Sequence, residues 1–449
     1  MRSYSFRQMF RKYVTSSVVL IFATLLALII ANSQWGNIYA QFWNQPVSLS
    51  IGNFNLFSHN GTTLTVMGVI NDFLMSIFFF SVGLEIKREI LVGELSSLKK
   101  AMLPIIGACG GMLFPVLVFL LVCPDNELML RGSAIPMATD IAFSLGMLST
   151  FGRRVPLSLK VFLAALAVAD DLGGIIVIAL FYSSEIHTQY LVYAALLVLI
   201  LIGGNLRGIR SKLFYISVGV FVWYCLLNSG IHATIAGVIV AFTIPTTLKS
   251  STMFFVERIR RSINQFPITE APKRSRTPAL LTDEQIGLLK SIETASDHVI
   301  SPLQDMEDTL HNPINYLIVP IFAFANAGIM FAGMEWNSLF SGVGLAVMLG
   351  LVIGKFAGIF TFSWLAIKSK LVNMPTGCNW KSFASVCMLG GIGFTVAMFI
   401  ADLSYDSTTA AGAELLNDAK LGILAGSILS GLIGWIMLHR TLPHEAQNE

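Results

Sequence analysis

Two short stretches decide the fold we expect for this chain: AIPMATDIAF at residues 134–143 and MLGGIGFT at residues 388–395. Each interrupts a long apolar run, the first with Pro136 and the second with three glycines within four positions. Proline and glycine least favour a helix interior. Inside a bilayer, the backbone groups freed by such a break must line a cavity or find another partner. The stretches therefore predict two broken helices, although glycines also simply let membrane helices pack closely.

The composition is that of a multi-pass membrane protein. Of the 449 residues, 55% are hydrophobic and only 12% are charged, whereas soluble domains carry about 25% charged residues. The net charge is only +3 and the basic residues are spread among loops, which excludes nucleic acid as a partner. The five cysteines have no metal-ligand spacing, and no nucleotide-binding or metalloprotease motif occurs. We therefore expect no resident cofactor and no enzymatic activity.

The apolar runs predict an all-α polytopic protein with twelve membrane-spanning helices, at about 20 residues for each crossing. All but three of the 29 Lys and Arg residues fall at the termini or in the even-numbered loops. Because cytoplasmic loops are enriched in Lys and Arg, this bias predicts that both termini are cytoplasmic. The exceptions are Lys355 inside a span and, in the outer loops, Arg131 and Lys420. The predicted spans are residues 13–32, 64–85, 102–123, 132–151, 157–182, 189–204, 213–229, 231–247, 313–332, 340–366, 382–401 and 419–438.

Two loops are expected to carry structure of their own. Residues 46–56 (PVSLSIGNFNL) alternate apolar and polar residues around a Gly-Asn pair, which predicts a small β-hairpin on the outer side. The long cytoplasmic loop 248–312 is polar. Within it we predict helix at 283–311 and a flexible segment at 273–278.

The two broken helices occupy equivalent places in two halves of the chain. The third to fifth and the tenth to twelfth predicted helices form sets of three with opposite topology, and the middle helix of each set is broken. Inverted-topology repeats with interrupted helices are typical of transporters whose substrate site lies near the bilayer midplane. We divide the chain into residues 1–101 (first two helices and outer hairpin, part of an interface panel), 102–182 (first core repeat), 183–332 (rest of the panel, with loop 248–312) and 333–449 (second core repeat).

Five charged residues are predicted well inside the spans, away from the span ends, where each costs about 2.5–3.5 kcal/mol or more. They are Asp72, Asp140, Asp170, Asp171 and Lys355. Salt bridges explain part of the set, but one lysine cannot neutralise four carboxylates. The remaining acids must be protonated, hydrated or bound to a cation. Carboxylate, hydroxyl and carbonyl oxygens suit small cations, and a carboxyl buried beside another binds protons more readily. Protons and a small cation could therefore compete for the same oxygens.

The adjacent aspartates Asp170 and Asp171 cannot both face one point, because neighbouring helical residues point about 100° apart. One is expected to face an ion cavity and the other a second partner, for which Lys355 is the available base.

Two other classes of membrane protein use similar residues. A sodium-coupled organic anion symporter would need a base to hold the anion, and an intramembrane aspartyl protease would need two aspartates that share a proton. The GxGD motif of such proteases is absent.

A set of motifs that covers most of the chain in order identifies a family. The chain resembles the NhaA-type sodium/proton antiporters of bacterial inner membranes. The motifs are SVGLEIKREI (81–90), ATDIAFSLG (138–146), DDLGGIIVIALFY (170–182), SGIHATIAGVIVAF (229–242), VPIFAFANAG (319–328), IGKFAGI (353–359) and GIGFTVAMFI (391–400).

The resemblance implies roles for individual residues. Asp171 would be the principal carboxylate that binds the cation and the proton, with Asp140 and Thr139 beside it where the broken helices cross. Asp170 and Lys355 would form an ion pair that opens on transport. The residues implied in pH sensing are Glu85, Arg88, Glu89, Glu307 and His311, together with His232.

The resemblance also implies a function: pH-regulated, electrogenic exchange of Na⁺ or Li⁺ for protons by alternating access. The two core repeats would move against a panel made of the other helices. The outer hairpin would form the contact of a homodimer, and the lipid bilayer would surround the protein in the bacterial inner membrane.

Overall fold

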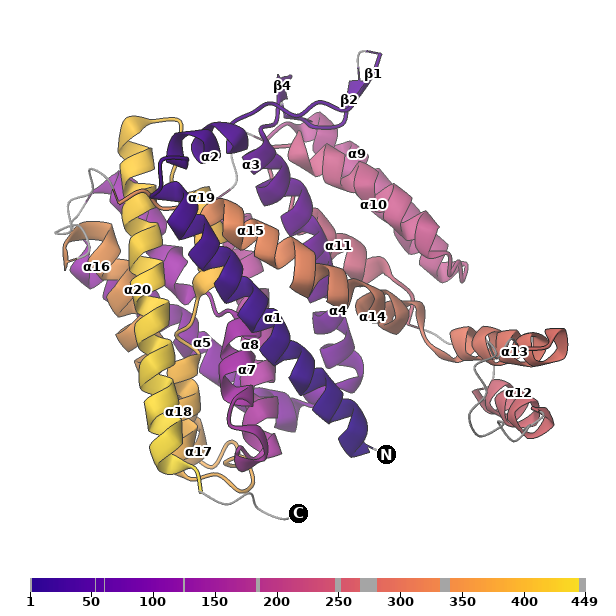
Figure 1. Ribbon diagram of the computed structural model, residues 1–449. Coiled ribbons are helices and arrows are strands. Elements are labelled where there is room, and N and C mark those ends of the chain that lie inside the picture. The colour runs from indigo at the N-terminus through magenta and orange to yellow at the C-terminus, as the bar shows by residue number, and fades with distance from the viewer. Residues whose placement is uncertain are drawn as a thin grey trace.

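The computed structural model describes residues 2–52, 54–59, 61–123, 126–182, 186–246, 252–266, 281–331 and 340–443. Its long helices lie side by side, with short strands at one end and both chain termini towards the other (Figure 1). The first helices are α1 (Arg2–Ala31), α2 (Gly36–Trp43), α3 (Val66–Gly68), α4 (Met75–Val92), α5 (Leu98–Val122), α6 (Glu127–Leu130), α7 (Ile141–Ser149), α8 (Leu157–Phe181), α9 (Thr188–Leu206) and α10 (Lys212–Leu227).

The remaining helices are α11 (Ile235–Thr243), α12 (Thr252–Gln265), α13 (Asp283–Val299), α14 (Pro302–Pro313), α15 (Val319–Asn326), α16 (Gly342–Leu349), α17 (Lys355–Lys368), α18 (Trp380–Leu389), α19 (Phe394–Ser404) and α20 (Ala410–Thr441). Tighter 3₁₀ turns occur at Glu94–Ser96, Arg131–Met137 and Gly152–Arg154, and wider π turns at Val69–Leu74, Ile314–Ile318 and Gly350–Gly354.

The described residues form a multi-pass membrane protein. Six helical segments are long and apolar enough to cross a bilayer, and two bent helix pairs raise the number to as many as eight. Each of the twelve predicted spans overlaps a helix, but α10, α11 and α15 are shorter than a crossing needs. The twelve-span count therefore stays a prediction. The six are Val66–Val92, Leu98–Val122, Leu157–Phe181, Thr188–Leu206, Gly342–Lys368 and Ala410–Thr441; the pairs are Ser16–Ala31 with Gly36–Trp43 and Trp380–Leu389 with Phe394–Ser404.

Both helix breaks predicted from the sequence are present. A 3₁₀ turn that contains Pro136 ends at Met137, and α7 begins only after three non-helical residues. In the second break, α18 and α19 are separated by the glycine-rich stretch and meet at 43°. The breaks touch, because the Asp140 amide donates a hydrogen bond of 2.7 Å to the Ile392 carbonyl. A Cβ on Gly393 would lie 3.0 Å from the Ala138 carbonyl oxygen, a tight contact that a larger residue could make only if the neighbouring backbone shifted.

The three π turns were not predicted. Each inserts one wide turn into an otherwise regular helix, and such turns often occur at functional sites. One contains Asp72, and another ends at Gly354, directly before Lys355. Apolar periodicity cannot reveal them, because one extra residue in a uniformly apolar helix changes no pattern.

The predicted β-hairpin is confirmed. Strand β1 (Ser50–Ile51) pairs antiparallel with β2 (Phe54–Asn55), and Gly52 in the turn has a φ of +61°, which glycine adopts without strain. A second hairpin, β3 (Ser58–His59) with β4 (Thr62–Thr63), was not predicted. Each of these strands is only two residues long, which is too short to show the alternation of apolar and polar residues that predicts a strand.

The long polar loop contains the predicted helix and an additional one. Helix α13 and the first part of α14 lie within residues 283–311, as the sequence predicts. Helix α12 precedes them and packs on α13, away from the main bundle (Figure 1). Residues 273–278, predicted to be flexible, lie outside the described residues.

Close helix packing positions the charged residues. Helix α5 packs along both α17 and α8. A Cβ on Gly110 would collide with the Gly358 carbonyl, and a Cβ on Gly358 would collide with the Gly110 carbonyl, so small residues set the α5–α17 separation. This packing holds the start of α17, with Lys355, against the aspartates of α8.

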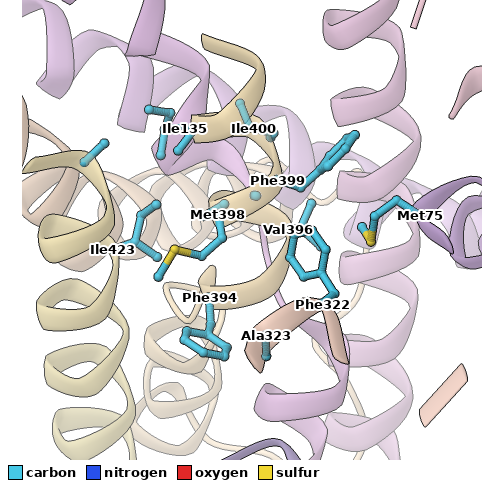
Figure 2. Close-up of a cluster of buried hydrophobic side chains, with 14 of the residues drawn as sticks. Met75, Ile135, Phe322, Ala323, Phe394, Val396, Met398, Phe399, Ile400 and Ile423 are labelled. Carbon is cyan, nitrogen blue, oxygen red and sulfur yellow. The ribbon is translucent and has the colours of Figure 1, made fainter. Parts of the chain in front are cut away.

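A layer of apolar side chains surrounds the second broken helix. Figure 2 shows Phe399 of α19 near Phe322 of α15 and Met75 of α4, with Met398 directed towards Ile423 of α20. All five side chains are almost completely buried. The layer excludes water from one side of the break in α18 and α19, so polar groups at the break must be satisfied by each other or by a cavity.

Candidate functional site

Asp140 joins the two breaks. It caps the start of α7, where its Oδ1 accepts from the Phe143 amide at 3.0 Å. Its Oδ2 accepts from both the hydroxyl (2.6 Å) and the amide (3.1 Å) of Thr395, at the start of α19. The amino ends of two helices therefore point at one carboxylate, which favours its negative charge. Asp140 is 2% exposed and is held rigidly by these bonds.

The carboxyl end of α18 faces the hydroxyls of the first break. Thr139 donates to the Gly390 carbonyl at 2.9 Å, and Ser144 donates to the Leu389 carbonyl at 3.0 Å. The Leu389 carbonyl also accepts from the Ile392 amide, so the hydroxyls add acceptor contacts at a helix end where the regular backbone hydrogen bonds stop. The Thr139 hydroxyl retains lone pairs that can serve a cation.

Asp170 and Lys355 form a buried ion pair. The Lys355 ammonium donates to Asp170 Oδ2 and to the carbonyl of Met137, the last residue of the 3₁₀ turn. Lys355 is fully buried and Asp170 is 3% exposed. Burial of two charges costs several kcal/mol for each ion, and the pair is tolerated only because each charge compensates the other.

Asp171 faces a cavity. It makes no hydrogen bond to another described residue, although it is only 7% exposed. The cavity has an empty volume of about 620 Å³, part of it open to solvent. Its polar lining comes from Ser81, Glu85, Thr139, Asp140, Asp171, His311, Asn315 and Thr395. The Asp171 carboxylate accepts no hydrogen bond from a described residue and lies beside the Asp140 carboxylate, so it can bind a proton or a small cation.

The cavity extends towards a cluster of charged residues. Arg88 Nε lies 3.2 Å from Glu307 Oε1, and Arg88 Nη2 lies 3.0 Å from Glu89 Oε1. Burial raises the pKa of Glu307 to about 7, although Arg88 opposes this shift, and Glu85 adds to it. Glu307 therefore changes charge in the physiological pH range. Glu85, which lines the cavity, interacts electrostatically with all three residues of this cluster, and His311, which also lines the cavity, lies one turn after Glu307 on α14.

His232 and Asp72 are not among the residues that line the cavity. His232 lies in the turn between α10 and α11, hydrogen-bonded to the backbone of Tyr182. Asp72 lies in the first π turn, where its carbonyl accepts from the Trp223 indole at 3.2 Å. Neither residue touches the paired aspartates of α8.

Two features were missed in the sequence. Thr395 directly follows the glycine-rich break, and its position at a helix start was the available signal that it would serve Asp140. Lys420 was assigned to an outer loop, but it lies in α20, 8% exposed, and pairs with Asp402 at 3.0 Å. Its apolar flanks were the overlooked signal that this lysine is buried.

The donor atoms of the site are oxygens. Among the described residues, no group of three or more His, Cys, Asp and Glu side chains is arranged to hold a metal ion. Two carboxylates and hydroxyls are hard oxygen donors, which match an alkali cation better than a transition metal.

Comparison with known proteins agrees with this chemistry. The family model described as Na⁺/H⁺ antiporter 1 matches residues 7–438. The Na(+)/H(+) antiporter NhaA of Bacteroides thetaiotaomicron is 54% identical over 430 residues, which covers 96% of each chain. The Na(+)/H(+) antiporter NhaA of Phocaeicola vulgatus is 50% identical over 447 residues, covering 100% of this chain and 98% of the relative. The Na(+)/H(+) antiporter NhaA 2 of Syntrophotalea carbinolica is 41% identical over 443 residues.

The fold and the cavity together define a membrane protein with ionisable groups buried at interrupted helices, the arrangement of an ion transporter. Because the family model matches residues 7–438, which is nearly the whole chain, the protein belongs to the Na⁺/H⁺ antiporter 1 family.

Proposed function

We propose that this protein exchanges Na⁺ or Li⁺ for protons across the bacterial inner membrane, by alternating access at Asp171. The observation that carries the proposal is the uncommitted, buried carboxylate of Asp171 beside the fixed carboxylate of Asp140. The names of the curated relatives, all Na⁺/H⁺ antiporters, support the same exchange.

Asp171 and Asp140 have different roles in this mechanism. Asp140 keeps its position, because two helix ends and Thr395 donate to it, and it offers its remaining lone pairs to the cation. Asp171 alternates between a proton and the cation. A proton that arrives from the outside neutralises Asp171 and releases Na⁺ there, and loss of that proton to the cytoplasm restores the site for the next Na⁺. Thr139 supplies a further oxygen.

Protonation of Asp171 is one change in charge during the cycle, and the ion pair of Asp170 and Lys355 provides a second. Electrogenic exchange requires more than one proton for each cation. We infer that the pair opens during the cycle, so that a proton bound there moves together with the one on Asp171. The pair is buried next to Asp171, and opening it exposes a carboxylate and an ammonium to the same cavity.

Alternating access requires two parts of the protein that move relative to each other. We propose twelve spans with both termini in the cytoplasm, in which the inverted repeats 102–182 and 333–449 form the moving core. Residues 1–101 and 183–332 form the panel, and the β-hairpin joins two copies in a homodimer. The meeting of the two breaks within the core supports this division, because it ties the repeats to each other through Asp140.

Regulation by pH is assigned to the cluster of Arg88, Glu89 and Glu307 with Glu85 and His311. The raised pKa of Glu307 supports this part of the proposal. As pH rises through about 7, Glu307 loses its proton and the cluster gains a negative charge at the cavity mouth, which attracts Na⁺.

Everted membrane vesicles test the exchange. An acid gradient is established, NaCl, LiCl or KCl is added between pH 6.5 and 9, and the fluorescence of an acridine dye reports the gradient. We expect dequenching with Na⁺ and Li⁺, and none in Asp171→Asn. The matched control is Asp283→Asn, which neutralises an exposed carboxyl of α13 and should behave as the parent chain does. Full exchange by Asp171→Asn would refute the assignment.

A further inference from the structure

Four polar side chains form a closed ring outside the ion cavity. Asp402 of α19 and Lys420 of α20 are 3.0 Å apart. Asn71, in the first π turn, donates to Asp402 at 3.1 Å, and Asn326, at the end of α15, donates to Asn71 at 3.0 Å. Lys420 closes the ring with a longer bond of 3.5 Å to Asn326. None of the four lines the cavity.

The ring joins the two bodies of the proposed transporter. Asp402 and Lys420 belong to the second core repeat, whereas Asn71 and Asn326 belong to the panel. Each body contributes a bonded pair, and two hydrogen bonds connect the pairs across the boundary. Any rotation of the core against the panel must therefore break bonds within the ring or carry it along.

The ring and the ion cavity lie on opposite sides of the apolar layer. Along α19, Thr395 contacts Asp140, Phe399 belongs to the apolar layer shown in Figure 2, and Asp402 enters the ring. A rise of 1.5 Å per residue puts Asp402 roughly 10 Å beyond Thr395 along the helix. The order repeats on the panel, where Asn71 precedes Phe79 in the chain and the Phe79 ring packs against Phe399 at a tilt. Glu85, which lines the cavity, follows Phe79 along α4, on the side of the layer away from Asn71.

Buried polar groups of this kind are costly unless all are satisfied. Lys420 and Asn326 are 8% and 2% exposed, so each needs its partner. The ring satisfies them only while the core and the panel are in the arrangement seen here. The same groups would otherwise require water, which is present only when this side of the molecule opens. The ring is therefore stable in one of two arrangements and hydrated in the other.

We propose that Asn71, Asp402, Lys420 and Asn326 form an outer latch, which holds the core against the panel while the site faces the cytoplasm and opens when the site faces outwards. The latch rests on the proposed antiport function. Its members are positioning residues, because they do not contact the transported ions.

Cross-linking tests the latch in the full chain, reconstituted into proteoliposomes after its five native cysteines are replaced by serine. The pair Asn71→Cys with Asp402→Cys joins panel to core. The matched control, Asn71→Cys with Asn326→Cys, joins two residues of the panel. Both pairs are treated with a short bifunctional methanethiosulfonate reagent and assayed for Na⁺/H⁺ exchange before treatment, after treatment and after reduction.

We expect the panel-to-core link to abolish exchange and reduction to restore it, while the panel-to-panel link leaves at least half of the rate. Exchange by the linked Asn71–Asp402 protein overturns the latch, and so does equal inhibition of the control. The untreated variants and the parent chain report antiport itself, so a failure of the proposed function is seen before any link forms.

A kinetic measurement does not depend on cysteine variants. Asn71→Ala removes one of the two bonds across the boundary and leaves the core ion pair intact. The weaker latch lowers the population of the inward-facing state, which raises the apparent KM for Na⁺ on the cytoplasmic side between about two- and tenfold without lowering kcat. An unchanged KM with less folded protein would show a merely structural role and overturn the proposal.

Discussion

The buried ion pair of Asp170 and Lys355 makes a prediction about stability. Asp170→Asn removes the carboxylate that neutralises the Lys355 ammonium in a site with no exposed surface, and leaves only neutral oxygens as its hydrogen-bond acceptors. Removal of one member of a buried pair costs about 3–5 kcal/mol. Because Lys355 is 0% exposed, we expect the upper half of this range.

The loss converts into a shift of the melting temperature. An unfolding entropy of about 2 cal/mol/K for each residue gives roughly 0.9 kcal/mol/K for a chain of 449 residues, and hence a drop in Tm of about 4–5 °C. Membrane helices persist after tertiary structure is lost, which lowers the entropy, so this shift is a minimum. The assay is thermal unfolding of the purified protein in detergent micelles, followed by tryptophan fluorescence.

A double-mutant cycle separates the pair from the individual residues. In Asp170→Asn with Lys355→Met, no unpaired charge is left, so we expect at least half of the lost stability to return. Asp283→Asn, an exposed carboxyl, controls for the loss of any one charge. The reasoning is refuted if Asp170→Asn melts as the parent chain does, or if the double variant is destabilised by the sum of the two single changes.

Three further predictions address the rest of the site. Thr395→Val removes the hydroxyl bond to Asp140 while it preserves side-chain size, and should raise the KM for Na⁺ about five- to twentyfold in proteoliposomes; an unchanged KM would contradict the role of Thr395. Because the pKa of Glu307 is raised from its ordinary 4.5 to about 7, stability should fall as pH rises between these values, and Tm measured against pH should lose this slope in Glu307→Gln. Gly391→Ala introduces a Cβ that collides with a backbone carbonyl of the neighbouring helix and should sharply lower the yield of folded protein on gel filtration, whereas Gly203→Ala, which meets open space, should leave the yield unchanged.

Several parts of the fold follow from local chemistry and could be predicted from the sequence. Pro136 and the glycines at 390–393 mark the two breaks, because proline lacks an amide hydrogen and glycine lacks a side chain to pack. The hairpin turn at Gly52 follows for a similar reason, since its positive φ favours glycine. The adjacent aspartates of α8 separate as helical geometry requires, one towards Lys355 and one towards the cavity.

Other features depend on tertiary contacts that the sequence does not encode locally. The π turn before Lys355 changes no apolar pattern, and both hydrogen bonds to Asp140 Oδ2 come from Thr395, 255 positions away. In the sequence, Lys420 resembles a lysine of an outer loop. In the structure, α20 packs against α19, and Asp402 neutralises Lys420. Pairings between distant segments cannot be read from periodicity, because periodicity describes only one helix at a time.

The central claim is that a proton and Na⁺ compete for Asp171. The most direct test is titration of the purified, detergent-solubilised protein with NaCl in weakly buffered solution, with the protons released measured for each Na⁺ bound. We predict that Na⁺ binding by the parent chain releases protons, and that Asp171→Asn releases none and binds Na⁺ far more weakly. Na⁺ binding without proton release, or unchanged release in Asp171→Asn, would contradict the account.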